Sequence, residues 1–167
     1  MRLSLTILLL PCLLLACVPP APPPPTAPSA IPTDPGVLRR QLAALPGAVA
    51  GAGEAPAVSY PAETLFAAGA ALPLAGGLEL LDPLAAVLSA HPDLQWRGTV
   101  RASGGVSAAY DALLASRRLE LLQRYFRNKG IDEARLALTA EASAGPPLEL
   151  VAVQPPASSA SSVPEKR

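Results

Sequence analysis

The chain has 167 residues, of which 50% are hydrophobic, 4% aromatic and 16% charged, and its formal net charge is zero. A neutral chain lacks the basic surface of a nucleic-acid-binding protein, so composition argues against nucleic acid as a partner. Both cysteines, Cys12 and Cys17, lie near the N-terminus, so the rest of the chain can form neither a disulfide framework nor a thiolate metal site.

The N-terminus has the features of an export signal. Arg2 precedes an apolar run to Ala16, which is shorter than the roughly 20 residues that a membrane-spanning helix needs. The last residues before Cys17, Leu-Leu-Ala, resemble a bacterial lipobox. The alternative is an ordinary signal peptide with a chance cysteine. The lipobox resemblance implies that residues 1–16 are removed and that Cys17 carries acyl chains such as palmitate, which anchor it in lipid. The residue after Cys17 is Val18, whereas in many such lipoproteins an aspartate at this position means retention in the inner membrane. The resemblance therefore implies that the chain is anchored in the outer membrane and faces the periplasm.

Residues 17–56 are predicted to be a linker after the lipidated cysteine. Proline dominates residues 18–35 and cannot build a core, because its ring fixes φ and removes a hydrogen-bond donor. A short helix that ends at Pro46 is possible within this linker. Residues 155–167 are polar and are predicted to be a disordered tail. One domain therefore remains, over residues 57–154.

The domain shows alternating strand and helix patterns. Strands are predicted over residues 58–66, 94–102, 135–141 and 147–154, and helices over residues 72–91 and 107–128. Pro61 demands an edge or a break in the first strand. Asp82 is predicted to cap the regular part of the first helix, and Gly130 to follow the end of the second. The order β-α-β-α-β-β predicts an α+β sandwich with helices on one face of a small mixed sheet.

The second helix places an arginine among apolar side chains. At about 100° per residue, Arg118 falls in the middle of a stripe that includes Tyr110, Leu114 and Leu121. A buried cation without a partner is costly. Arg118 is therefore expected to reach solvent along the surface, to bind a carboxylate through two parallel hydrogen bonds, or to be a structural arginine whose donors are satisfied.

The segments on either side of this helix, and the helix itself, resemble those of a known family. The segment ETLFAAGAALPLAGGLELLDPLAAVLSAHPDLQW, residues 63–96, is similar to the opening of the OmpA-like C-terminal domain, which peptidoglycan-associated lipoproteins share. Tyr110-Asp111, Leu114-Ala115, Arg117-Arg118 and Gly130-Ile131 then follow at the spacing of that family. No single motif is specific, but their order and spacing together resemble the family from Glu63 to Leu136.

The resemblance implies a peptidoglycan site. In the family, an aspartate at the end of a strand takes the ammonium of diaminopimelate in the stem peptide, and the second arginine of the helix takes a carboxylate. Arg118 stands at the arginine position, Ser103 at the aspartate position and Arg101 at the histidine position two residues earlier. Asp111 is a candidate substitute for the missing acid. The family's Asn-Arg-Arg before the last strand is absent, because residues 145–147 read Gly-Pro-Pro.

Two functions follow from these features. The first is an outer-membrane lipoprotein that binds peptidoglycan weakly through Arg118. The second is a structural or assembly protein that keeps the fold but binds an envelope protein partner. An enzyme is not expected, since the single histidine, His91, has no acid, cysteine or second histidine spaced with it as a triad or metal site. No cofactor and no metal are expected.

Overall fold

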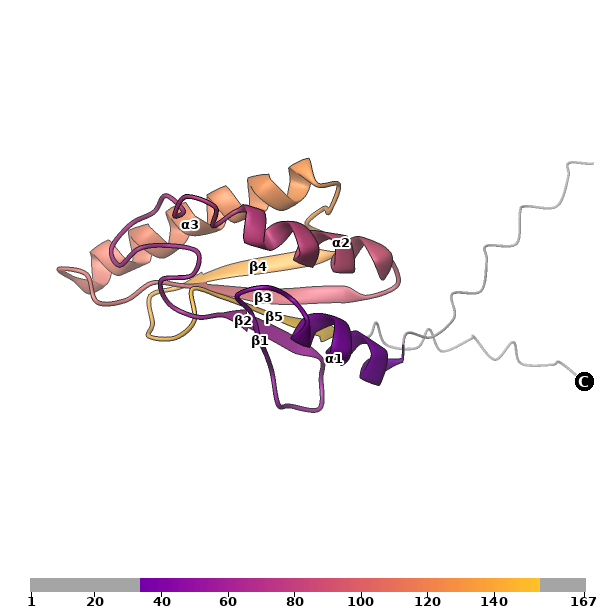
Figure 1. Ribbon diagram of the computed structural model, residues 1–167. Helices are drawn as coiled ribbons and strands as arrows, with labels where there is room; N and C mark the ends of the chain where they lie inside the picture. The colour runs from indigo at the N-terminus through magenta and orange to yellow at the C-terminus, as the bar shows by residue number, and fades with distance from the viewer. Residues whose placement is uncertain (1–33, 154–167) are drawn as a thin grey trace, which may run out of the picture.

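The computed structural model describes residues 34–153 (Figure 1). The predicted signal peptide, Cys17, the proline-rich part of the linker and the predicted tail lie outside these residues. The elements are α1 (Pro35–Ala43), β1 (Val49–Ala50), β2 (Ala57–Tyr60), the 3₁₀ turn η1 (Glu79–Leu81), α2 (Asp82–Ala90), β3 (Gln95–Arg101), α3 (Ala108–Asn128), β4 (Leu136–Glu141) and β5 (Leu148–Val153).

The strands form one mixed sheet in the order β1-β2-β5-β3-β4. β3 and β4 are parallel and are joined by α3, whereas the other neighbours are antiparallel. Figure 1 shows α2 and α3 lying over one face of the sheet. A single core cluster contains buried leucines from all three helices, which places α1 on the same face. The predicted α+β sandwich with helices on one face of a mixed sheet is confirmed.

The predicted half-buried strand around Trp96 is β3, in the interior of the sheet. Trp96, Gly98 and Val100 are buried, while Gln95 and Arg97 are exposed. Gly98 has a packing reason: a Cβ on it would lie 2.3 Å and 2.4 Å from the Cδ2 atoms of the leucines at positions 150 and 138. The side chains of the two flanking strands thus close over the glycine, and a larger residue would require both leucine side chains to shift.

The limits of α3 agree with the sequence. The hydroxyl of Ser107 caps the helix by accepting a hydrogen bond from the Tyr110 amide at 3.1 Å. At the other end Gly130 has a φ of +80°, which glycine adopts without strain, and it follows the C-cap residue Lys129.

Asp82 is not the cap that the sequence predicted. It is the first residue of α2, with φ −61° and ψ −46°, because η1 runs directly into the helix. Its carboxylate instead pairs with Lys129 at 2.7 Å and accepts a hydrogen bond from the Tyr125 hydroxyl. These bonds, that of Lys129 above all, lower the pKa of Asp82. The start of α2 is therefore fastened to the end of α3.

The first predicted strand ends early. β2 stops at Tyr60, and the predicted remainder, residues 61–66, leaves the sheet at Pro61. Proline cannot donate to a strand ladder, so it breaks this strand, which was one of the two outcomes expected of it. The segment that follows, up to η1, forms irregular loops over one end of the sheet, as Figure 1 shows.

The linker predicted over residues 17–56 differs from the structure in its second half. Residues 35–43 form α1, and Leu38, Leu42 and Leu45 are buried in the main core. Residues 49–50 pair with β2. The Ala- and Gly-rich composition suggested a flexible chain, but leucines at positions i, i+4 and i+7 give one apolar helical stripe. The folded unit thus begins before residue 57.

Truncation of a leucine in α1 tests whether this helix belongs to the cooperative domain. Leu42→Ala is expected to lower the free energy of unfolding by about 2–5 kcal/mol, because Leu42 is fully buried and its loss leaves a cavity. Val37→Ala, on the exposed side of α1, is the control and should cost less than about 1 kcal/mol. Equal denaturant midpoints for both variants would show that α1 does not stabilise the domain.

Candidate functional site

One end of the sheet carries a small pocket with a volume of about 130 Å³. Its walls come from the loop after β2, the end of β3, α3 and the residues just before β5. The register pairs Val100 with Leu148 at this end and Gln95 with Val153 at the other. The pocket therefore lies at the end of the sheet away from Asp34 and Val153, where the described chain begins and ends (Figure 1).

Arg118 forms part of this pocket and is only 6% exposed. Its guanidinium donates from Nε to the carbonyl of Ala70 at 2.9 Å, from Nη1 to that of Arg101 at 3.1 Å and from Nη2 to that of Ala67 at 3.1 Å. The group also lies over the ring of Phe66, 4.7 Å from its centre. Arg118 thus neither reaches out along the surface nor pairs with a carboxylate within residues 34–153, and it joins α3 to β3 and to the loop after β2.

The three hydrogen bonds to backbone carbonyls hold the guanidinium in place but do not use all of its N–H donors. An arginine has five N–H donors, and three of those of Arg118 are used, so two have no partner within residues 34–153. Burial lowers the pKa of Arg118, since the charged form loses solvation there. A buried cation that is held in place and has two donors to spare favours an anionic ligand, and little side-chain entropy would be lost on binding.

The structure brings Ser103 to the same pocket as Arg118 but does not bring Asp111 there. Ser103 is exposed, just past the end of β3, and lines the pocket. Asp111 is not among the lining residues, and its Oδ1 accepts a hydrogen bond from the Gly105 amide at 2.9 Å. That bond fixes the turn between β3 and α3. Asp111 therefore shapes the loop that carries Ser103, while Ser103 offers the pocket a neutral hydroxyl.

Arg101 contributes little charge to the pocket although it lines one wall. Its guanidinium pairs with Glu149 at 2.5 Å and with Glu141 at 3.3 Å. The hydrogen bond to Glu149 is the main reason that the pKa of Arg101 is raised. These two carboxylates already balance the cation that stands at the histidine position of the resembling family.

Tyr110 adds a second connection between α3 and the loop after β2. Its hydroxyl donates to the carbonyl of Gly69 at 2.9 Å. The side chain is 38% exposed, so Tyr110 lies at the edge of the stripe that the sequence predicted, whereas Arg118 lies inside it. The buried residues of α3 are Leu114, Ala115, Arg118, Leu122 and Phe126.

Glu63 is a pocket residue that sequence reasoning missed. The Thr64 amide donates to the Pro61 carbonyl at 3.3 Å, which closes a turn, and Glu63 occupies its third position with a φ of +65°. No other non-glycine residue within 34–153 has a positive φ. Pro61 was the available signal of a turn, but the alternation of the segment favoured a strand.

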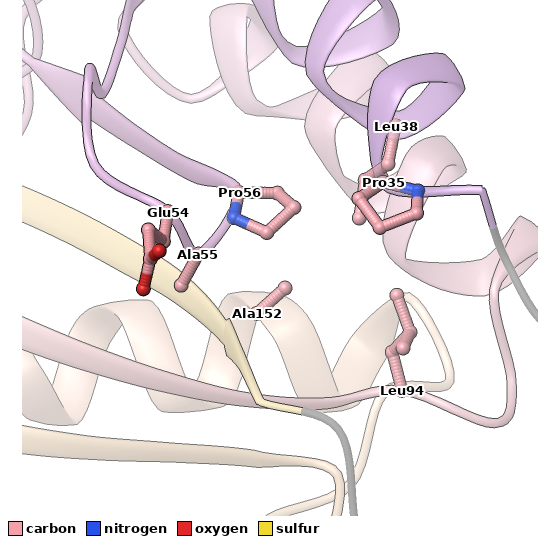
Figure 2. A pocket seen from close by; sticks show the side chains of 7 residues that line it. All are labelled: Pro35, Leu38, Glu54, Ala55, Pro56, Leu94 and Ala152. Atoms are coloured by element: carbon pink, nitrogen blue, oxygen red, sulfur yellow. The ribbon is translucent and has the colours of Figure 1, made fainter.

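A larger cavity, of about 240 Å³, lies at the opposite end of the sheet (Figure 2). It is lined by Pro35, Leu38, Glu54, Ala55, Pro56, Leu94 and Ala152. The figure shows apolar side chains around the opening, with Glu54 at one edge. No set of polar groups converges on it, so we place the candidate site at the smaller pocket around Arg118.

Within residues 34–153, no group of three or more His, Cys, Asp or Glu side chains is placed to hold a metal ion. Within the same residues, no helix has both the length and the apolar character that crossing a membrane requires.

Replacing each of two neighbouring arginines, one buried and one exposed, tests whether the buried one stabilises the fold. Arg118→Ala is expected to lower the free energy of unfolding by at least about 2 kcal/mol, because three hydrogen bonds to backbone carbonyls are lost. Arg117→Ala is the control. Arg117 is exposed and pairs only with Glu120, so its loss should cost no more than about 0.5 kcal/mol. Similar melting curves for the two variants would contradict the structural role of Arg118.

No protein-family model and no curated protein matches the sequence. Solved structures do match. The periplasmic domain of Helicobacter pylori MotB (residues 90–256) superposes with a TM-score of 0.54 at 12% identity, over 66% of this chain and 82% of that one. A putative MotB-like protein from Desulfovibrio vulgaris gives 0.53 at 20% identity, over 72% and 91%.

The OmpA-like domain of FopA1 from Francisella tularensis aligns with a TM-score of 0.45 at 15% identity, over 64% of this chain and 78% of that one. The MotB periplasmic domains are themselves OmpA-like domains. At identities below 25%, the likenesses to the MotB domains establish the fold alone, and they confirm at that level the resemblance seen in the sequence: the described part of this chain is a divergent domain with the OmpA-like fold.

Proposed function

We propose that this chain is an outer-membrane lipoprotein whose OmpA-like domain binds the stem peptide of peptidoglycan weakly, through the pocket around Arg118. The observation that carries the proposal is the state of the guanidinium. It lines a pocket, is held by three backbone carbonyls and has two N–H donors without partners within residues 34–153. These donors suit a carboxylate of diaminopimelate, the ligand that the family resemblance implies.

Ser103 accounts for the weakness of this binding. A hydroxyl can accept a hydrogen bond from the ligand ammonium but cannot balance its charge. Loss of one partner of a desolvated charge pair costs on the order of 2–5 kcal/mol. A domain that has lost the acid at position 103 and gained no substitute for it would therefore bind tens- to thousands-fold less tightly than one that has it.

The position of the pocket supports an anchored arrangement. Residue 34, through which the chain continues toward Cys17, lies at one end of the sheet, and the pocket lies at the other. A lipid on Cys17, followed by the proline-rich segment, would present the pocket to the periplasm and away from the membrane.

An assembly role is the second candidate, and a specific surface favours it. Near the head of α3, Leu72 is 75% exposed, Leu113 54% and Val106 93%. Leu72 and Leu113 flank Ala71 and Arg117 in adjoining surface hollows. Exposed apolar side chains of this size suit a protein partner. The backbone bonds of Arg118 also explain its burial without any ligand.

An added acid at position 103 tests the wall-binding function. Ser103→Asp is expected to tighten binding of the full chain, in detergent, to a diaminopimelate-containing muropeptide by tenfold or more, about 1.4 kcal/mol, because the ammonium gains an ionic partner. Ser116→Asp, on an exposed position of α3 outside the pocket, adds the same charge and should change nothing. Isothermal titration and co-sedimentation with sacculi measure the effect.

Arg118→Lys completes that experiment. Lysine keeps the charge but loses the planar set of donors, so binding should fall at least tenfold. If Ser103→Asp and Arg118→Lys both bind sacculi as the unmodified chain does, the wall-binding function is wrong and the assembly role remains.

The lipid anchor has its own test. Cys17→Ser is expected to abolish incorporation of labelled palmitate and to leave an unprocessed or soluble periplasmic form, since the acylated thiol is lost. Cys12→Ser, within the same predicted signal, should be labelled and fractionate with the outer membrane. Labelling of Cys17→Ser at the level of the unmodified chain would exclude Cys17 as the anchor.

A further inference from the structure

We propose that Glu63 is the anionic partner in the Arg118 pocket: its carboxylate takes the ligand ammonium that the aspartate takes in the resembling family, while Arg118 takes the carboxylate. The inference rests on the proposed function, and it gives the pocket two opposite charges in place of one. The ligand class that fits such a pocket is an α-amino acid end, which carries an ammonium and a carboxylate on one carbon.

The first support is placement. Glu63 lines the same pocket as Arg118 and Ser103, although it lies 40 positions before Ser103 in the chain (103 − 63). Glu63 makes no hydrogen bond or ion pair within residues 34–153, and Arg118 makes no ion pair there. Two opposite charges therefore share one pocket without being in contact. A zwitterionic group between them would neutralise both.

The second support is the backbone at Glu63. A φ of +65° is rare for glutamate, and glycine or asparagine is the usual residue at such a turn position. Strained residues of this kind concentrate at binding sites, where the surroundings hold them in place. The turn closed by Thr64 and Pro61 puts Glu63 on the pocket wall, whereas a continued β2 would have kept it in the sheet.

The third support is the size of the pocket. At about 130 Å³ it is smaller than the roughly 300–1,000 Å³ of pockets that enclose a drug-sized ligand. It therefore admits the end of a side chain rather than a sugar ring. The free end of diaminopimelate carries both charges, whereas a lysine side chain at the same place in a stem peptide has the ammonium alone. The pocket should accordingly prefer the diaminopimelate peptide.

The test is a titration of the full chain, in detergent, with a diaminopimelate tripeptide stem and with its lysine counterpart. Glu63→Gln is expected to weaken binding of the diaminopimelate peptide at least tenfold and to reduce its preference over the lysine peptide. Glu79→Gln, an exposed glutamate on η1 outside the pocket, is the matched control and should bind as the unmodified chain does. The double variant Glu63→Gln with Ser103→Asp should regain the lost affinity, since an acid returns to the pocket.

A folding control keeps the result interpretable. Glu63→Gly should retain the melting temperature, because glycine adopts a positive φ without strain, and should lose binding as Glu63→Gln does. If Glu63→Gln binds as the unmodified chain does while Arg118→Lys is weakened, the role of Glu63 is overturned and the proposed function stands. If the unmodified chain binds neither peptide and Ser103→Asp does not create binding, both fail together.

Discussion

The burial of the Arg118 guanidinium is the constraint on which this end of the domain depends. The loop after β2 is largely irregular, so few of its backbone groups are paired in a strand ladder, and its buried carbonyls depend on donors from elsewhere. Arg118 supplies two such donors to the loop and a third to the end of β3. The partial charges of these carbonyls and the face of Phe66 stabilise the cation in place of a counter-ion. The pocket has its shape because these contacts hold its walls together.

Patterns that are local in the chain could be read from the sequence. The alternation around Trp96 and the cap and stop of α3 depend on neighbours within a few residues, and the structure confirms them. The presence of Arg118 in an apolar stripe correctly marked it as unusual. Its partners could not be foreseen, because the three carbonyls lie 48, 17 and 51 positions away and belong to the backbone, where side-chain identity leaves no signal.

Two features were missed for a different reason. The short helix before Pro46 was expected, but the linker-like composition around it led to the prediction that it lies outside the domain, whereas α1 packs into the core. At Glu63 the relevant property is the sign of φ, and glutamate carries no preference for positive values. Only the surroundings decide that conformation, so comparison with the family directed attention to Ser103 and Asp111 and gave no sign that Glu63 lines the pocket.

These observations change what the arginine alone can indicate about function. Because α3, β3 and the loop after β2 all depend on Arg118, the fold would retain it even in a chain that has no ligand. Its presence is therefore weak evidence for binding. The side chain of Glu63, in contrast, makes no hydrogen bond or ion pair within residues 34–153, and its positive φ is unfavourable for a residue with a side chain. A carboxylate with a positive φ and no ion pair, in the same pocket as a fixed cation, is explained by a ligand more readily than by the fold. The functional information in this pocket therefore lies in the acid and in the two unused donors of Arg118, and the mere presence of the arginine adds little to it.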